Sequence, residues 1–561
     1  MNEKLLQYLV SQGMLTAAQA DQLRKEQAER KVSVRQLILQ QELLPEEKLI
    51  EALSYLSRMP TVRLYEQNIP IGVRQMIRGD LLREYLIMPF GFDPKDENTL
   101  MVAINDPMNI KGQDVAGITT KCRIRPYLAT TPDILLTIDR YYGTEEMKEA
   151  AEQYTQTSTQ DDTLDEQLLQ ENVNSSPVVM LVNSLVEQAA RQRASDIHVE
   201  AGAGRVRVRC RVDGVLYETA AYDMRLLSAI VARIKIISGM DISEKRRPQD
   251  GRFSITVDHR EYDVRVSTLP TVYGEKCVLR LAQKQAIKRS KQSLGFNQAE
   301  MEQFDRILAK PNGIVLVTGP TGSGKSTTMY TALSELNDPG VNIVTVEDPV
   351  EANIEGVNQV QVNPKADLTF ANALRSILRQ DPDIIMIGEI RDDETAEIAV
   401  QASITGHLVL STLHTNDSAS SVTRLLDMGV ESYLIADATV GIIAQRLVRR
   451  LCPHCKKGRP ILEHEAEYLK LPREQWAETK LWEPCGCQRC GGTGYYDRVG
   501  VFEVMEITPR LRAMIAHREP TDALRAEALA SGMRTMWESG RDMVLSGETA
   551  LSELQRISME E

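Results

Sequence analysis

The chain has 561 residues, of which 42% are hydrophobic and 26% are charged. This composition is ordinary for globular proteins and excludes a collagen-like or wholly disordered chain; at roughly 150 residues per domain, the length predicts three or four domains. The net charge of −13 argues against a protein that mainly coats nucleic acid.

The start of the chain and its apolar runs bear on location. Residues 1–13 form an amphipathic pattern without the basic head and continuous apolar run of a signal peptide. No apolar stretch approaches the roughly 18 residues that cross a membrane. We therefore expect a cytoplasmic protein, in which the eight cysteines stay reduced and need an explanation other than disulfides.

Residues 1–144 predict a helical repeat followed by a small α+β unit. Apolar positions of a first helix pair return about 29 residues further on, as Leu5 does in Val34, and stacked helix pairs bury such faces against each other. From 62 to 142, short strands such as 100–104 alternate with helices. We expect one N-terminal domain that combines both parts.

Residues 145–176 have the composition of a linker. They are rich in Gln, Thr, Ser and acidic residues, and Lys148 is their only base. Such a segment cannot bury a core and its like charges repel each other, so we expect an acidic, flexible tether. The alternative is a single solvated surface helix.

Residues 177–292 predict a helix followed by an antiparallel sheet. After the helix at 178–193, arginines alternate with apolar residues along 205–212, and similar alternation returns at 262–266 and 277–281. A period of two with charge on one side is typical of half-buried strands. We expect an α+β domain here.

Residues 293–561 predict a parallel α/β domain with a phosphate-binding loop, because buried apolar strands alternate with helices. The strand 313–317 runs into a glycine-rich loop that can aim backbone N–H groups at a phosphate, and a helix follows. Lys325 would reach the β- and γ-phosphates, and the Ser326 hydroxyl would hold Mg²⁺. The loop residues are Gly319, Pro320, Thr321, Gly322, Ser323, Gly324, Lys325, Ser326 and Thr327.

The strand at 383–389 ends where a P-loop NTPase usually carries an aspartate that reaches Mg²⁺ through water. Gly388 stands at that position, and Glu389 follows as a candidate general base for the attacking water. Another group must then help to place the metal. Glu347 and Asp348, at the end of another apolar strand, 341–346, are the nearest candidates.

Two histidines bracket the apolar strand 408–413. A lone histidine is usually structural, but His407 and His414 border one strand of a sheet that already carries Lys325 and Glu389. Ligands bind at the carboxyl ends of strands in open parallel sheets. His414, at that end, is therefore the better candidate for a γ-phosphate sensor.

The cysteines favour a zinc site within residues 446–500. Two C-x-x-C pairs lie about 30 residues apart, and two turns with paired thiolates predict a closed tetrahedral site. Cys485 is a rival ligand, and a redox C-x-x-C pair is the alternative function. The candidate ligands are Cys452, Cys455, Cys487 and Cys490. The thiols expected in apolar cores are Cys122, Cys210 and Cys277.

Together these motifs resemble the type II secretion and type IV pilus assembly ATPases. The resemblance covers residue 177 to the C-terminus, and a glycine at the place of Gly388 is itself a trait of that family. The matching motifs are SDIHVE at 195–200, RVDG at 211–214, PQDGR at 248–252, the P-loop, VEDPVE at 346–351, GEIRD at 388–392 and the histidine box at 405–416.

The resemblance implies roles for individual residues. Lys325 and Ser326 would bind ATP and Mg²⁺, and Glu389 would activate water. His407 and His414 would belong to the histidine box. Arg265 and Arg280, in the preceding domain, match family arginines that approach the nucleotide. Without the resemblance they would be interpreted as solvated charges on the face of a sheet. Further arginines that match around the site are Arg375, Arg379 and Arg391. The family pattern C-x-x-C-x-G-T-G-Y favours Cys487 and Cys490 over Cys485 as zinc ligands.

The resemblance also implies the architecture and the partners. It predicts a RecA-like P-loop ATPase core with a zinc-binding insert, a preceding α+β (PAS-like) domain and a helical N-terminal docking domain. The protein would be a homohexamer that assembles pilin-like subunits at an inner-membrane platform protein and binds a cytoplasmic docking partner there. It would be peripheral to the membrane and bind no nucleic acid directly. A non-hydrolysing scaffold and a pilus retraction motor are the alternatives.

The N-terminal domain has an alternative role in the family, since a related version binds cyclic di-GMP through an Arg-Leu-Gly opening and repeated glycines. The corresponding segments here, 3–6 and 33–36, read EKLL and SVRQ and lack that opening. We therefore expect partner docking, with dinucleotide binding as the alternative.

Overall fold

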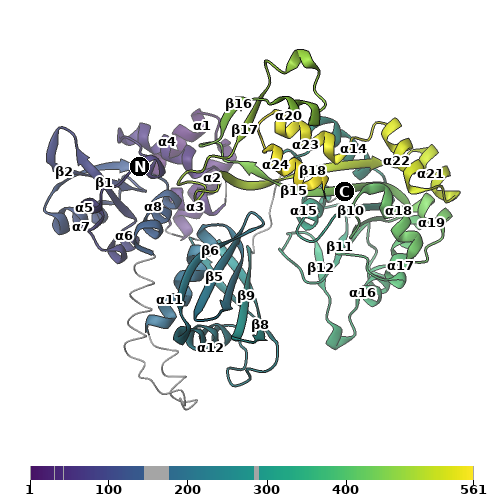
Figure 1. Cartoon of the computed structure of the whole chain (residues 1–561), viewed down its shortest axis with the longest axis horizontal. Helices are drawn as coiled ribbons and strands as arrows, with labels where there is room; N and C mark the ends of the chain where they lie inside the picture. The colour runs from purple at the N-terminus through teal and green to yellow at the C-terminus, as the bar shows by residue number, and fades with distance from the viewer. Residues whose placement is uncertain are drawn as a thin grey trace. The chain divides into compact units, whose positions relative to one another are not determined.

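A computed structural model describes residues 2–30, 32–41, 43–143, 176–258, 260–283 and 290–559. The chain divides into two compact units, Met1–Ala282 and Gln283–Glu561, and each is described by itself (Figure 1). The expected acidic tether, 145–176, lies outside the described residues apart from Ser176. Among the described residues, no helix combines the length and apolar character needed to cross a membrane.

The first unit begins with two helix pairs, as the repeat predicts. Gly13, with φ +67°, closes the turn inside the first pair, and the Ser33 side chain caps the first helix of the second pair by accepting a hydrogen bond from Gln36 N. The repeated positions Leu5 and Val34 are both buried. The helices are α1 (Asn2–Ser11), α2 (Ala17–Arg30), α3 (Val34–Gln40) and α4 (Glu46–Ser57).

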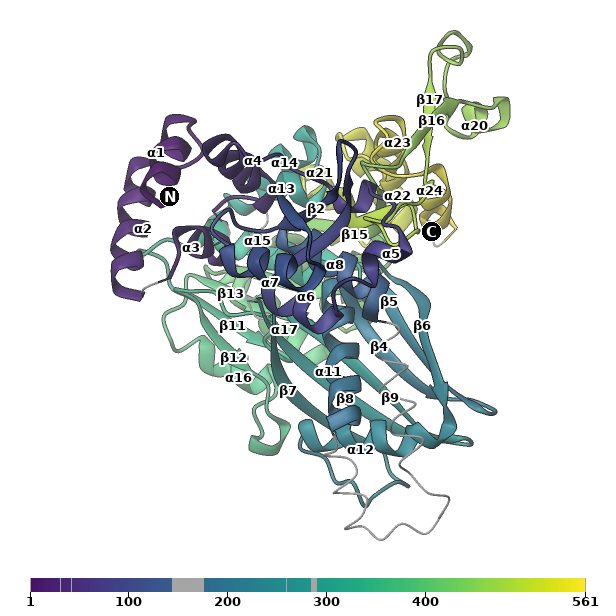
Figure 2. The same ribbon diagram turned by 90° about the vertical axis from the view of Figure 1, so that its left-hand side faces the viewer.

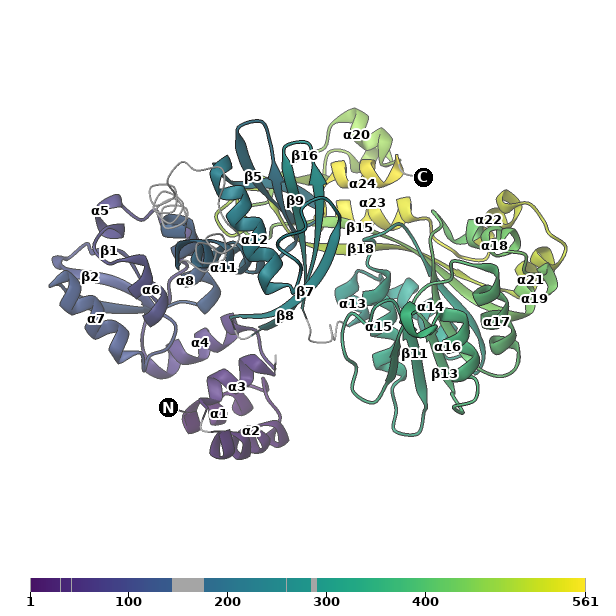
Figure 3. The ribbon, with the colours of Figure 1, turned by 90° about the horizontal axis from the view of Figure 1, so that it is seen from below.

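A small three-stranded sheet follows the helix pairs. Its central strand β2 pairs antiparallel with β1 and parallel with β3. One apolar core extends from Leu5 to Ile138, so the helix pairs and the sheet share their interior. Figure 3 shows β1 and β2 with α6 and α7 beside them. The elements are η1 (Leu64–Glu66), α5 (Ile71–Arg74), α6 (Gly79–Tyr85), β1 (Ile87–Asp93), β2 (Asp96–Ile104), α7 (Ile110–Thr120), β3 (Arg123–Leu128), α8 (Thr131–Ile138) and η2 (Asp139–Gly143).

The rest of the first unit is a six-stranded sheet with strand order β6-β5-β4-β9-β8-β7. Valines of β5 such as Val206 and Val208 are buried in a core shared with α11 and α12, while the intervening arginines are not. Figure 2 shows α11 and α12 against this sheet. The elements are α11 (Ser176–Arg191), β4 (Ala194–Ala201), β5 (Arg205–Val212), β6 (Val215–Asp223), η3 (Met224–Leu226), α12 (Leu227–Ile237), β7 (Gln249–Val257), β8 (Arg260–Thr271) and β9 (Gly274–Gln283).

The second unit is built on a seven-stranded sheet with order β12-β11-β13-β14-β10-β15-β18. All neighbouring pairs are parallel except β15 and β18, and β10, β11, β13 and β14 are buried along their whole length. Two apolar cores hold alternate residues of these strands, as in a sheet covered on both faces. This is the expected α/β ATPase core.

The second unit's elements, in chain order, are α13 (Lys291–Leu294), α14 (Gln298–Leu308), β10 (Gly313–Thr318), α15 (Lys325–Leu336), β11 (Ile343–Glu347), β12 (Asn358–Gln361), η4 (Pro364–Ala366), α16 (Phe370–Ile377), β13 (Ile384–Ile387), α17 (Asp393–Ile404), β14 (Leu408–Leu413), α18 (Ser418–Asp427), α19 (Ser432–Ala438), β15 (Thr439–Leu451), β16 (Lys457–Pro460), α20 (Glu463–Tyr468), η5 (Arg473–Gln475), β17 (Lys480–Glu483), β18 (Tyr495–Glu506), α21 (Pro509–Ala516), α22 (Thr521–Ala530), α23 (Met536–Leu545) and α24 (Leu551–Ser558).

The three cysteines expected in apolar cores differ in burial. Cys210 and Cys277 are buried, whereas Cys122 is only half-buried. Cys122 follows α7 at a chain reversal, where Lys121 adopts φ +57°, and its thiol lies 3.4 Å from the carbonyl oxygen of Thr120. Cys122 packs against the core of the first unit without being fully buried, so the expected full burial of this thiol is wrong, because it lies in a turn at the edge of the core.

Candidate functional site

The glycine-rich loop connects β10 to α15 and passes close to β15. Gly319, Gly322 and Gly324 have φ values of +149°, +80° and +89°, a region that glycine adopts at no steric cost. A Cβ on Gly319 would stand 2.4 Å from the carbonyl oxygen of Gln445. The loop can therefore take this path only with glycine at 319, and it ends at the N-terminus of α15, where helix N–H groups favour an anion.

Lys325 is the first residue of α15 and turns back over the loop. Its Nζ donates hydrogen bonds to the carbonyl oxygens of Gly319 at 2.8 Å and Pro320 at 3.1 Å. Burial lowers the pKa of Lys325 to about 8, Glu389 opposes that shift and the Arg446 charge adds to it. An ammonium group held so over a loop of N–H donors is suited to an anionic ligand such as a triphosphate.

The other loop residues differ in exposure. Pro320, Thr321 and Gly322 are exposed or nearly so, Ser323 is buried, and Ser326 and Thr327 are half-buried in the first turn of α15. Thr328 Oγ1, one residue further, donates to Gln445 Oε1 at 2.8 Å and fixes this turn to β15. The Ser326 hydroxyl thus lies at the helix start, where the P-loop pattern places a metal ligand.

Glu389 follows β13 and lies at the same edge of the sheet as the P-loop, because β13, β14 and β10 run parallel. Arg391 donates to Glu389 Oε1 at 2.5 Å, and His414 Nε2 lies 3.3 Å from Glu389 Oε2. The Glu389 side chain is 13% exposed. The prediction that these strand ends gather Lys325, Glu389 and His414 at one edge agrees with the strand order.

His407 lies at the other end of β14. Its carbonyl oxygen accepts a hydrogen bond from Gly313 N at the start of β10, and its Nδ1 is 2.9 Å from the carbonyl oxygen of Ala402. The length of β14 therefore separates His407 from His414 within this chain, and the structure does not bring the two histidines together.

Glu347 and Asp348 have different surroundings, although they are adjacent. Glu347 is buried, and its carboxylate accepts hydrogen bonds from three side chains, Thr345 at 2.6 Å, Gln359 at 3.0 Å and Tyr330. Asp348 is exposed, and it adds to the effect by which Glu389 raises the pKa of Arg391. Of the two, Asp348 is the carboxylate open to a ligand.

The packing around residue 388 does not require a glycine there. A Cβ there would lie 3.4 Å from the nearest atoms, Glu347 Cα and Val346 O, which is an ordinary contact distance.

The predicted arginines occupy separate places. Arg391 contacts Glu389. Arg375, on α16, pairs with Glu394 at 2.5 Å on the surface, and Arg379 donates to the carbonyl oxygen of Arg375 at 2.8 Å. The structure thus brings Arg391 to the Glu389 carboxylate, while Arg375 and Arg379 contact groups on α16 and α17.

Arg265 and Arg280 belong to the first unit and face acidic partners on its sheet. Arg280 Nε lies 3.1 Å from Asp196 Oδ1, and Arg265 Nε lies 3.7 Å from Asp263 Oδ2. The Arg280 side chain is 66% exposed, so its guanidinium remains accessible.

The four predicted cysteine ligands form one cluster, with all their Sγ atoms within 4.8 Å of one another. The Sγ–Sγ distances are 3.8 Å for Cys452 and Cys487, 3.9 Å for Cys455 and Cys490, and 3.7 Å for Cys487 and Cys490. Tetrahedral zinc with bonds of about 2.3 Å requires edges of about 3.8 Å, so the cluster fits this ion. Cys490 Sγ also accepts hydrogen bonds from Cys487 N and Gly494 N.

Cys485 lies outside that cluster. It is exposed, and its Sγ is 3.8 Å from the carbonyl oxygen of Glu483. A backbone hydrogen bond joins the two cysteine-bearing segments, since Cys452 N donates to Gly494 O at 2.9 Å.

Sequence reasoning missed two buried charged residues beside the site, Arg446 on β15 and Glu503 on β18, which are 3% and 1% exposed. Both contact the segment after β14 that carries His414. The sequence signal was weak, because other charged residues share these strands, such as Arg449 on β15 and Asp497 on β18. Buried arginine and glutamate side chains are almost always paired.

Comparisons with known proteins give consistent results. Residues 171–556 match the profile of a family described as Type II/IV secretion system protein, and residues 57–148 match the MshEN domain. The chain is 48% identical over 393 residues to the putative type II secretion system protein E of Escherichia coli (strain K12), covering 70% of this chain and 79% of that protein.

A second relative matches nearly from end to end. The type IV pilus assembly ATPase PilB of Myxococcus xanthus (strain DK1622) is 39% identical over 562 residues, covering 99% of this chain and 98% of that protein. Among solved structures, the Legionella pneumophila ATPase DotB has a TM-score of 0.52 at 21% identity, covering 69% of this chain and 97% of that one. This last likeness concerns the fold alone.

Proposed function

Because this chain belongs to the type II/IV secretion system protein family of ATPases, we propose that it hydrolyses ATP to drive the assembly of pilin-like subunits at an inner-membrane platform. The observation that supports this most is one edge of the parallel sheet, where the P-loop, Glu389 and His414 meet. A phosphate-binding loop next to a carboxylate and a histidine can bind ATP and direct water at its γ-phosphate.

Lys325 and the N-terminus of α15 would hold the phosphates of ATP. Both lie at the end of β10, and Lys325 now bonds to two loop carbonyls that a phosphate would replace. The anionic charge would be met by the ammonium group and by the loop N–H groups. The proposed loop residues are 319–327.

Ser326 would hold Mg²⁺, which supplies charge neutralisation for the phosphates when bound. Asp348 fits a role beside it, because it is exposed and lies next to β11 at the same sheet edge. Glu347 fits less well, since three side chains already donate to its carboxylate. We therefore assign the metal-placing role to Asp348 and a bracing role to Glu347.

Glu389 would accept a proton from the attacking water, and His414 and Arg391 would orient its carboxylate, which both contact. Arg265 and Arg280 would stabilise charge that develops on the γ-phosphate, as arginine fingers do in related phosphoryl transfers. Arg375 and Arg379 would support the site through α16. We give His407 a structural role in this chain, at the far end of β14.

The cysteine cluster would bind one structural zinc ion through Cys452, Cys455, Cys487 and Cys490. The four thiolates would form a closed site, with no position for a substrate. Such a site would join the end of β15 to the start of β18, where Leu451 pairs with Tyr495.

The protein would act as a homohexamer, peripheral to the inner membrane on the cytoplasmic side, and bind a platform protein and its cytoplasmic docking partner. The N-terminal 1–144 domain would dock the partner. Arg35, the arginine in its second repeat, pairs with Glu46 at 2.5 Å and contacts Thr131 Oγ1 at 3.0 Å. Because this guanidinium is already engaged inside the domain, docking is favoured over dinucleotide binding.

Two observations favour different branches of the family. The pilus assembly relative matches 99% of this chain, which favours a type IV pilus. The type II secretion relative is more identical, at 48%, but matches 70%. We propose pilus assembly as the first candidate and the secretion pseudopilus as the second.

Phosphate release by the purified hexamer tests the enzymatic part. Lys325→Ala and Glu389→Gln should each lower kcat for ATP by at least about 100-fold, since each removes a group on which phosphoryl transfer depends. Lys365→Ala, on the exposed η4 turn of the same unit, is the matched control. Wild-type turnover in either site variant would refute the assignment and favour the scaffold alternative.

Gene deletion in the source organism separates the two branches. Loss of surface fibres in electron micrographs, restored by the wild-type gene but not by Glu389→Gln, supports pilus assembly. Loss of secreted enzymes with intact fibres supports the second candidate. More fibres than in the parent strain would indicate a retraction motor.

A further inference from the structure

The segment that carries His414 is fastened to the strand that ends in the P-loop. Residues 414–418, here called the 414–418 turn, connect β14 to α18. Thr415 N donates to Thr318 Oγ1 at 3.0 Å, and the hydroxyl groups of Thr318 and Thr415 are 2.5 Å apart. Thr318 is the last residue of β10. This contact ties the start of the turn to the P-loop.

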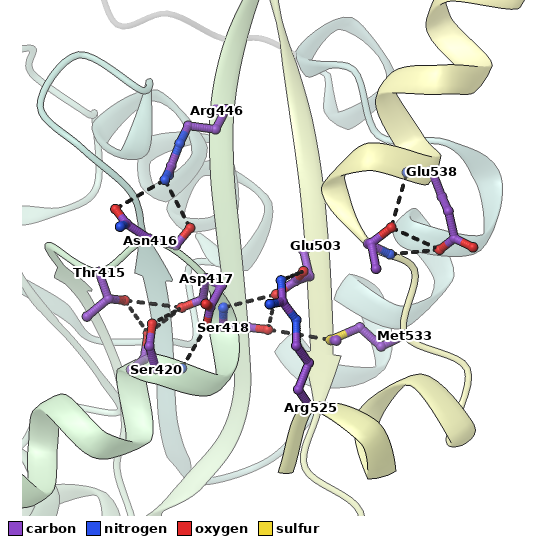
Figure 4. A network of polar contacts seen from close by, with 12 residues as sticks. Thr415, Asn416, Asp417, Ser418, Ser420, Arg446, Glu503, Arg525, Met533 and Glu538 are labelled. Carbon is purple, nitrogen blue, oxygen red and sulfur yellow. Dashed lines mark hydrogen bonds and ion pairs between the residues drawn. The ribbon is translucent and has the colours of Figure 1, made fainter. Parts of the chain in front are cut away.

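Arg446 holds the middle of the turn. Thr318 pairs with Ala444, so Arg446 lies on β15 just beyond the end of β10. One guanidinium nitrogen donates to the carbonyl oxygen of Asn416 at 3.0 Å and contacts its Oδ1 at 3.3 Å (Figure 4). A second donates to the carbonyl oxygen of Gln445 at 3.3 Å. The residue is 3% exposed, so a buried cation lies against Asn416.

Glu503 holds the end of the turn from β18. Its carboxylate accepts hydrogen bonds from Ser418 N, at 3.0 Å, and from Ser418 Oγ. Ser418 is the first residue of α18, where the N–H groups and the helix dipole favour a negative charge. Arg525 of α22 lies 3.9 Å from the same carboxylate. Figure 4 shows Glu503 between Ser418 and Arg525.

We propose that Arg446 and Glu503 are positioning residues for ATP hydrolysis, which act through the 414–418 turn to hold His414 against Glu389. They anchor the middle and the end of the turn, while Thr318 anchors its start. Buried charges are costly to leave unpaired, so this arrangement favours one conformation of the turn. The proposal rests on the roles proposed above for Glu389 and His414.

A double-mutant cycle on kcat tests the proposal. A displacement of about 1 Å in a catalytic group costs about 100-fold in rate, so Arg446→Gln should lower kcat by about that factor in the otherwise wild-type hexamer. In the His414→Ala background the same substitution should cost less than about threefold, because the turn then carries no imidazole to place. The Kd of a fluorescent ATP analogue should change less than about threefold in both backgrounds.

A second set of variants tests Glu503 and includes a conservative substitution. Glu503→Ala should lower kcat as Arg446→Gln does, whereas Glu503→Gln should recover most of the rate, because its amide oxygen still accepts from Ser418. Glu506→Gln is the control on the same strand, since Glu506 pairs at the surface with Arg306 at 3.1 Å, away from the turn. Should Arg446→Gln fail to fold by circular dichroism, Glu503→Ala takes its place in the cycle.

Two results would overturn the inference. An equal loss of kcat in both backgrounds would show a general structural effect, and a large rise in Kd with unchanged kcat would show that Arg446 contacts the phosphates directly. A wild-type kcat in His414→Ala alone would instead contradict the role proposed for His414. The failures of the two proposals are therefore distinguishable.

Discussion

Lys325 shows how the place of a residue changes its chemistry. A lysine in water keeps its charge up to pH of about 10.4, but burial at the start of α15 brings the pKa of Lys325 to about 8. Its charge is therefore complete well below that pH and is lost as the pH rises through it. A bound triphosphate stabilises the charged form, so binding and protonation of Lys325 are linked.

This linkage predicts the pH dependence of nucleotide binding. Above pH of about 8, the affinity of the wild-type protein for ATP should fall by up to about tenfold per pH unit, because a proton must be taken up on binding. Titration of a fluorescent ATP analogue from about pH 7.5 to about pH 9.5 measures this. Lys325→Arg, which stays charged in this range, should show a flat profile. A wild-type curve no steeper than that of Lys325→Arg would contradict the prediction.

Local pattern singled out the candidate catalytic residues but not the side chains that contact them. Lys325 and Glu389 follow buried strands, and a strand end can be read from a few residues. Glu347 also ends a strand, yet Tyr330 of α15 and Gln359 of β12 surround its carboxylate. No local spacing links these three elements, so only the packed sheet shows that the Glu347 carboxylate already accepts hydrogen bonds from its neighbours.

At the scale of elements, β15 and β18 carry the cysteine-rich insert and border the nucleotide site. The two strands pair from Gly441 with Glu506 to Leu451 with Tyr495. β15 passes beside the P-loop at Gln445, and the end of the pair at Leu451 and Tyr495 leads into the cysteine cluster. Figure 1 shows β16, β17 and α20 beyond this strand pair. A metal there would close the insert as a hairpin.

The cysteine cluster predicts the zinc content of the protein and which substitution should abolish zinc binding. Elemental analysis should find one zinc per chain in the wild-type protein and in Cys485→Ser, whose side chain lies outside the cluster. Cys455→Ser should lose the metal and lower the thermal midpoint of unfolding, because structural zinc contributes directly to folding. Wild-type protein without zinc, or full zinc in Cys455→Ser, would refute the proposed four-cysteine site.

The strands of the parallel core could be predicted individually, because they are continuous apolar runs bounded by turn residues. The strand expected at 408–413 is β14 to the residue. The four-residue strands β12, β16 and β17 are not continuous apolar runs and carry no such signal. Their pairing depends on distant partners, which local periodicity does not encode.

At the scale of the whole molecule, the P-loop and the proposed arginine fingers belong to different units. Lys325 and Glu389 lie in Gln283–Glu561, whereas Arg265 and Arg280 lie in Met1–Ala282. In an oligomer, such arginines can serve the site of their own chain or that of a neighbour.

Mixed oligomers can test whether Arg280 acts at the site of its own chain or at that of a neighbouring chain. Arg280→Ala should lower kcat by about 1,000-fold, while Arg207→Ala, whose guanidinium pairs with Glu200 at 3.1 Å on the same sheet, should leave it near the wild-type value. If Arg280 acts on a neighbouring chain, co-assembly of Arg280→Ala with Glu389→Gln should restore part of the activity measured as phosphate release. No restoration would place the arginine at its own chain's site, and an active Arg280→Ala protein would contradict its catalytic role.

The sequence by itself determined the nucleotide class, the candidate general base, the members of the cysteine cluster and the layered α/β core. These features depend on short motifs and on strand hydrophobicity, which are local properties of the chain. Only the tertiary structure decided that His407 and His414 lie at opposite ends of β14, that Glu347 is enclosed, and that Arg446 and Glu503 hold the 414–418 turn. Each of these depends on which strands become neighbours, and strand order arises from packing of the whole sheet.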